Sequence, residues 1–121
     1  MCIRDSYGLG WPERIGSGVA ELDIVEAGRL DFEAPDEARF PCLGLGRAAV
    51  RSGGTAAAAL NAANEEAVAA FLEGQLGFMD IPHVIETVLV RTETGEPASL
   101  DVVKDADQRS RALAREAINK R

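Results

Sequence analysis

The sequence is poor in aromatic residues and in cysteine, and both shortages limit what the chain can be. Only 5% of its 121 residues are aromatic, so any core has to be built from aliphatic side chains and alanine. Cys2 and Cys42 are too few for a disulfide framework, and their spacing fits no metal site. We therefore expect a reducing, cytoplasmic compartment, with Cys42 buried as a small apolar side chain rather than exposed as a reactive thiol.

Long apolar runs and an excess of positive charge are also missing. No stretch approaches the roughly 20 apolar residues of a membrane-spanning helix, and residues 1–6 lack the apolar region of a signal peptide. The formal net charge of −7 disfavours nucleic acid or an anionic membrane as a partner. A hydrophobic share of 46% is ordinary for a folded chain, so we expect one globular domain, or one domain with an arm.

The clearest periodic pattern lies in residues 55–72 and predicts an amphipathic α-helix. Thr55 is a suitable N-cap, because its hydroxyl can accept a hydrogen bond from the first turn. The apolar side chains that recur at helical spacing on one face are Leu60, Ala63, Ala67, Val68 and Phe71. We expect this helix at the centre of a small bundle that Leu60, Val68 and Phe71 hold together.

Three further helices are predicted around this one. The first begins at Pro41 and ends before the glycines at 53 and 54, the second follows Asp80, and the third follows Ser99 as N-cap. The side chains expected to face inward are Leu45, Ala48, Ala49 and Val50 in the first, Ile81, Ile85, Val88 and Leu89 in the second, and Leu100, Val103, Ala106, Ser110, Leu113 and Ala117 in the third. Four helices with short links are typical of a four-helix bundle, here over residues 39–121.

The chain before this bundle is predicted to be an arm over residues 7–38. Four glycines and Pro12 make residues 7–18 a loop, in which we expect Trp11 to anchor on a neighbouring surface. Residues 1–6 fit no pattern and are expected to be a non-native start.

Two short strands are predicted within the arm. Apolar side chains alternate with acidic ones at Leu22 and Ile24, and again at Leu30 and Phe32, which is typical of half-buried strands. Because an isolated two-stranded hairpin is marginal in water, we expect the arm to join a sheet that this chain does not supply.

Motifs that could carry chemistry are few. Gly44, Gly46 and Ala49 match the G-x-G-x-x-A pattern of dinucleotide-binding turns, but they fall inside a predicted helix rather than between a strand and a helix. The neighbouring acids Glu65 and Glu66, like the pair at positions 105 and 107, are most simply solvated faces, with a metal site as the less favoured alternative.

Three polar residues keep more than one interpretation. His83 is the only histidine, and a surface or partly packed side chain is favoured over a general base, because no nucleophile stands at a recognisable spacing. Asn61 and Asn64 lie in the helix of residues 55–72, where asparagine is a weak helix former. A structural role, such as capping or bridging helices, is favoured for both, and a ligand contact stays open.

Several blocks of the sequence are similar, in order and in spacing, to one enzyme family. The blocks are WPER (residues 11–14), LDFEAPD (30–36), RFPCL (39–43), LNAANE (60–65), VAAFL (68–72) and FMDI (78–81). From residue 7 to its end the chain resembles the C-terminal part of the 1-deoxy-D-xylulose 5-phosphate reductoisomerases. The resemblance implies a mainly α fold, a four-helix bundle-like C-terminal domain, preceded by an extended arm that belongs to a missing α/β catalytic domain.

The resemblance also implies a function. Family enzymes convert 1-deoxy-D-xylulose 5-phosphate to 2-C-methyl-D-erythritol 4-phosphate in non-mevalonate isoprenoid biosynthesis, as homodimers that use NADPH and a divalent cation, Mg or Mn. Their catalytic, cofactor-binding and metal-binding residues belong to two preceding domains and match no position here, so none is assigned to this chain. We expect a scaffold that is inactive alone, with the missing domains as its partners. The alternative is a stand-alone helical interaction module without enzymatic activity.

Overall fold

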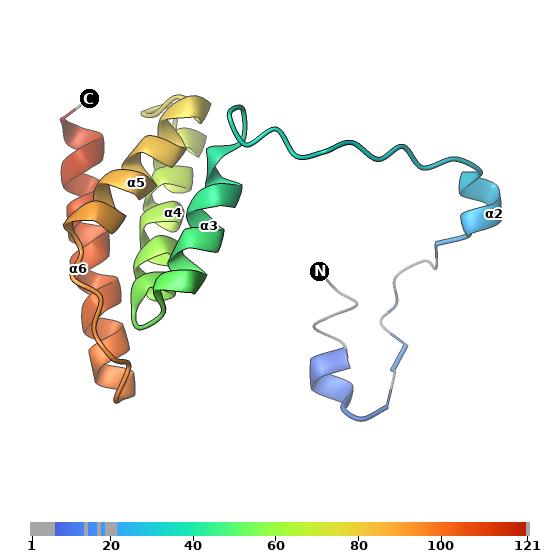
Figure 1. Ribbon diagram of the computed structural model, residues 1–121, viewed down its shortest axis with the longest axis horizontal. Coiled ribbons are helices and arrows are strands. Elements are labelled where there is room, and N and C mark those ends of the chain that lie inside the picture. Colours follow the sequence, from blue (N-terminus) through green and yellow to red (C-terminus); the bar gives the residue numbers. More distant parts are fainter. Residues whose placement is uncertain (1–6, 14, 17, 19–21, 121) are drawn as a thin grey trace. The chain divides into compact units, whose positions relative to one another are not determined.

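The computed structural model describes residues 7–13, 15, 16, 18 and 22–120 (Figure 1). The chain divides into two compact units, Met1–Ala34 and Pro35–Arg121. Outside the described residues lie the predicted non-native start at residues 1–6, which includes Cys2. The beginning of the predicted strand segment, at residues 19–21, also lies outside them.

The first unit has no strand in residues 22–34, which differs from the prediction of two short strands. Instead, Ile24–Ala27 form the short helix α2. The Asp23 carboxylate caps it by accepting hydrogen bonds from two backbone N–H groups of its first turn, at 2.8 and 3.0 Å. A strand needs a partner for its backbone groups, and the described part of the chain contains none, so the local cap prevails.

The loop predicted over residues 7–18 contains one turn of helix, at residues 7–10. The rings of Tyr7 and Trp11 meet edge to face with centroids 5.5 Å apart. Trp11 remains 70% exposed, so the anchoring role expected for it is not fulfilled by this contact.

The second unit is helical, as predicted. Its elements are α3 (Pro41–Ser52), α4 (Ala56–Leu72), the 3-10 turn η1 (Phe78–Asp80), α5 (Ile81–Arg91) and α6 (Leu100–Asn119). α4 and α5 each contact the other three α-helices of the unit (Figure 1). The helix expected at the centre therefore shares that place with α5.

The core combines small side chains from α4 with larger ones from α5. Six alanines of α4 are buried, at positions 56, 59, 62, 63, 67 and 70. Ile85, Val84 and Val88 of α5 are the largest hydrophobic side chains that are completely enclosed. The inward stripe predicted for α5 is confirmed, because Ile81, Ile85 and Val88 are buried and Leu89 packs against them.

Some of the side chains predicted to face the core do not do so. Phe71 is 37% exposed and does not hold the unit together, although Leu60 and Val68 do pack against the core. Alanines line the inner side of α4 and let neighbouring helices approach closely, which leaves no room for a phenyl ring there. On α3, Val50 is 75% exposed and Ala48 is exposed as well, whereas Ala49 is buried as predicted.

Thr55 does not cap α4 as predicted but ties the start of this helix to the loop before α6. Its side chain makes no capping hydrogen bond. Its hydroxyl oxygen accepts from the N–H of Gly95 at 3.2 Å, and its own N–H donates to the Gly95 carbonyl at 3.0 Å. Thr55 is buried, so this pair of bonds satisfies polar groups that are shielded from water.

The last helix begins as predicted, with the Ser99 hydroxyl accepting a hydrogen bond from the Val102 N–H at 3.4 Å. Its buried residues are Ala106, Ser110 and Ala114. Leu100, expected to face inward, is 67% exposed because it occupies the first turn, at the edge of the packed region.

Replacing Ser110 with alanine is expected to stabilise the protein by about 1 kcal/mol. The Ser110 hydroxyl is fully buried and has no hydrogen-bond partner, so the folded state bears its desolvation cost. Alanine keeps the small size that lets α6 lie close to its neighbours. Urea denaturation followed by circular dichroism measures the change, with the exposed Ser52→Ala as a control. A loss of stability in Ser110→Ala would contradict this account.

Candidate functional site

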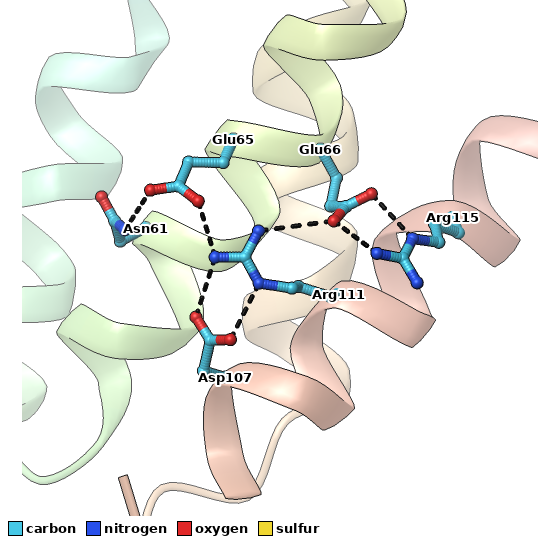
Figure 2. Close-up of polar contacts among 6 residues, drawn as sticks. All are labelled: Asn61, Glu65, Glu66, Asp107, Arg111 and Arg115. Atoms are coloured by element: carbon cyan, nitrogen blue, oxygen red, sulfur yellow. Dashed lines mark hydrogen bonds and ion pairs between the residues drawn. The ribbon is translucent and has the colours of Figure 1, made fainter. Parts of the chain in front are cut away.

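Charged side chains of α4 and α6 meet in one cluster on the surface of the second unit (Figure 2). The Arg111 guanidinium donates to Glu65 at 2.6 Å, to Glu66 at 3.4 Å and to Asp107 at 2.8 Å. Arg115 donates two further hydrogen bonds to Glu66, both of 2.8 Å. We call these five residues, together with Asn61, the α4–α6 charge cluster.

Helical spacing places the members of each helix on one side. Asp107, Arg111 and Arg115 follow one another at intervals of four, so they line one face of α6. On α4 the same interval lets the Asn61 amide donate to Glu65 at 2.9 Å. Asn61 thus orients a carboxylate within its own helix and, in this contact, bridges no second helix.

The cluster shifts the proton affinity of its members. The hydrogen bond from Arg111, then the one from Asn61, lowers the pKa of Glu65, and the hydrogen bonds from Arg115 lower the pKa of Glu66. Hydrogen bonds to Asp107 and Glu65 raise the pKa of Arg111 above its usual value. These carboxylates are therefore held in the charged form at neutral pH. In that form they can form ion pairs between helices, but they are poor proton donors and acceptors for catalysis.

Replacing Arg111 with glutamine is expected to destabilise the protein more than replacing Arg109. Arg111 separates three carboxylates that would otherwise repel one another, and its side chain is only 26% exposed. Arg109 makes one ion pair, with Asp105 at 3.4 Å, and both partners are largely exposed. The urea midpoints of Arg111→Gln and Arg109→Gln compare the two, and equal midpoints would show that Arg111 contributes no more to stability than one exposed ion pair.

Stability is expected to fall in acid because of Glu65 and Glu66. Their pKa values are lowered by folding, so their contribution is complete above the unfolded value of about 4.3 and is lost as the pH falls through the folded values. We expect the urea midpoint to change little between about pH 7 and about pH 5 and to drop below that. In a Glu65→Gln, Glu66→Gln double variant the drop should be shallower. An identical acid profile in both proteins would contradict the role of these groups.

The interpretation of Glu65 and Glu66 as a solvated face holds for Glu65, whose side chain is 53% exposed although it is ion-paired, and is corrected for Glu66. Glu66 is half-buried and pairs with Arg115, a residue 49 positions away, so no local pattern could reveal the contact. For the acids at 105 and 107 the outcome is divided. Asp107 joins the cluster, whereas Asp105 remains in an exposed pair on its own helix.

The remaining candidates are not brought together. Gly44 and Gly46 lie inside α3 and form no turn that could hold a pyrophosphate. His83 is exposed on α5, where its backbone carbonyl accepts from the Thr87 hydroxyl at 2.7 Å, and Asn64 is half-buried on α4. Among the described residues, no group of three or more His, Cys, Asp or Glu side chains could hold a metal ion.

Cys42 is exposed, so the prediction that it is buried is wrong. It lies in the first turn of α3 and borders a shallow apolar hollow, whose lining includes Leu43 and Val50. Contact with this surface desolvates the sulfur and raises the pKa of the thiol, so Cys42 is less reactive than its exposure suggests.

The fold and the cluster together define a class of protein, an α-helical domain with an alanine-rich core and an ion-paired α4–α6 contact. No helix in the described part of the chain has the length and apolar character to cross a membrane. The model of the family described as the DXP reductoisomerase C-terminal domain matches residues 1–113. The chain belongs to this family.

Known proteins similar to the chain agree with this assignment. A 1-deoxy-D-xylulose 5-phosphate reductoisomerase of Pseudomonas paraeruginosa is 58% identical over 109 residues, and one of Xanthomonas axonopodis pv. citri is 53% identical over 113. The matches cover 90% and 93% of this chain and 28% of each relative. The chain thus spans little more than a quarter of the length of these relatives.

Solved structures give the same result. The reductoisomerase of Zymomonas mobilis in complex with NADPH superposes with a TM-score of 0.81 at 39% identity, over 96% of this chain and 31% of that chain. A second reductoisomerase, in complex with NADPH, fosmidomycin and magnesium, superposes with a TM-score of 0.80 at 34% identity, over 98% of this chain and 31% of that chain. The helical fold is therefore that of a known domain.

Proposed function

We propose that the chain serves as the C-terminal helical part of a 1-deoxy-D-xylulose 5-phosphate reductoisomerase. The reaction converts 1-deoxy-D-xylulose 5-phosphate to 2-C-methyl-D-erythritol 4-phosphate for isoprenoid biosynthesis. The observation that carries the proposal is 58% identity to a reductoisomerase over 90% of the chain. NADPH and magnesium, present in related structures, are the cofactors we infer for the intact enzyme.

We infer that the role of this part is mechanical and that it has no activity alone. The polar groups that the fold gathers, in the α4–α6 charge cluster, are paired with one another and are suited to holding helices. Binding of substrate, NADPH and metal is assigned to the portion of the enzyme that this chain does not match. We infer that the intact enzyme is a cytoplasmic homodimer.

A chimera tests the proposal. The matching C-terminal region of the Pseudomonas paraeruginosa enzyme would be replaced by this chain, and NADPH oxidation with 1-deoxy-D-xylulose 5-phosphate would be followed by absorbance. We expect activity close to that of the parent enzyme, and none from the 121-residue chain by itself. An inactive chimera that is folded and binds NADPH would favour the alternative, a helical interaction module without enzymatic activity.

A further inference from the structure

The second unit exposes its phenylalanine and methionine side chains at one end, whereas the large side chains exposed elsewhere on it, Val50, Val90, Leu100 and Val102, are aliphatic. Phe40, Phe78, Met79 and Leu72 are 53%, 58%, 53% and 76% exposed. Phe71 and Leu43 are each more than one third exposed. We call these six residues the apolar end. Three of the four phenylalanines of the chain thus lie on this surface, while the buried hydrophobic core is made of alanine, valine, isoleucine and one leucine.

The chain topology brings these residues to the same end. α3 and α4 are in contact and are joined by residues 53–55 alone, so they run antiparallel. The first turn of α3 therefore lies at the end where α4 finishes and η1 begins (Figure 1). The rings of Phe71 and Phe78 meet there at a centroid distance of 5.8 Å, which joins the last turn of α4 to η1.

We propose that the apolar end is the surface on which the part of the reductoisomerase that precedes the matched region packs. This inference rests on the proposed function. Single exposed apolar residues are common, but several aromatic and methionine side chains together mark the centre of protein interfaces. Burying them against another apolar surface would recover the hydrophobic free energy that the second unit alone forgoes.

The position of the connection favours this occupant. The family match is to a C-terminal domain, and the chain spans 28% of its relatives, so most of each relative precedes the matched region. The second unit is entered through residues 35–40, and Phe40 is both the last residue of this connector and a member of the apolar end. The preceding polypeptide is thereby tethered at this surface, which gives it a high effective concentration there.

Methionine oxidation provides a direct test, because Met79 belongs to the apolar end. Hydroxyl-radical footprinting with mass spectrometry would be applied to the 121-residue chain and to the chimera with the Pseudomonas paraeruginosa enzyme. We expect the oxidation rate of Met79 to be several-fold lower in the chimera, while the rate at Val90, which is 81% exposed at the other end of α5, stays the same. Equal rates at Met79 in the two proteins would overturn the proposal.

A matched pair of substitutions adds a second readout. Leu72 and Val90 are both highly exposed aliphatic residues in the last turn of a helix. In the chimera, Leu72→Asp should raise the oxidation rate of Met79 towards that of the free chain, and Val90→Asp should not. If the protection of Met79 in the free chain instead increases with the concentration of that chain, a second copy of the chain covers the apolar end and the proposal is wrong.

The outcomes for docking and for function are separable. An active chimera in which Met79 oxidises as in the free chain would overturn the docking surface and leave the proposed function intact. A chimera that protects Met79 but lacks activity would support docking and contradict the function.

Discussion

Replacing Ile85 with alanine is expected to lower the free energy of unfolding by about 2–5 kcal/mol, which is a large part of the stability of a domain of this size. Ile85 is the largest completely enclosed hydrophobic side chain and lies on α5, which contacts each of the other three α-helices of the second unit. The alanines of α4 that face it are too short to fill the space that the substitution would leave. The cavity therefore remains and adds to the lost transfer free energy.

The measurement is urea denaturation followed by circular dichroism, with two comparisons. Val90→Ala on the same helix should change the free energy of unfolding by less than about 0.5 kcal/mol, because Val90 is exposed. Phe71→Ala should cost less than Ile85→Ala, since the phenyl ring is partly in water. A larger loss for Phe71→Ala than for Ile85→Ala would contradict this account and support the prediction, from helical periodicity alone, that Phe71 holds the core together.

Replacing Gly54 with alanine is expected to lower the free energy of unfolding by a similar amount, about 2–5 kcal/mol. Gly54 has φ +57, and a Cβ built there would stand 2.6 Å from the carbonyl oxygen of Gly95. Both the left-handed backbone and the contact oppose a side chain. Relief of the contact would move the loop at Gly95 and break the two hydrogen bonds that this residue makes with Thr55.

Gly74 offers a matched control for Gly54. Its φ is +73, yet nothing lies within 4 Å of the position that a Cβ would occupy. Gly74→Ala should therefore show only the backbone cost of about 1–2 kcal/mol. The difference between the two variants, measured by thermal and urea denaturation, isolates the close approach to Gly95. Equal losses would mean that the loop moves aside freely.

The helices were predictable because their signals are local. Pro41 at the start of α3, Ser99 as the cap of α6 and the apolar repeat of α5 each act within a few residues, so the sequence alone shows them. The similarity of the sequence blocks to the reductoisomerases could be recognised for the same reason, because it depends on the order of residues and not on their contacts. The strand prediction at Leu30 and Phe32 did not succeed, because alternation indicates a strand only where a partner strand is available.

The contacts that depend on distance along the chain were not predictable. Thr55 had the right type and place for an N-cap, but its partner is Gly95, forty residues away. Glu66 was predicted to be a solvated charge, because its partner Arg115 reaches it only through the packing of α4 on α6. Helical periodicity ranked Phe71 with Ala67 on one face, and it could not tell that close packing would admit the alanine and exclude the ring.

The sequence by itself determined the helical class, the bounds of the main helices and the family, because propensity, capping and residue order are properties of neighbouring positions. Only the tertiary structure decided which large apolar side chains stay exposed, which charges pair across α4 and α6, and that Cys42 is exposed. The physical reason is that burial depends on the size of the facing side chain. An alanine-rich helix such as α4 packs small side chains on its buried face, and its large apolar side chains remain exposed, where another surface can cover them.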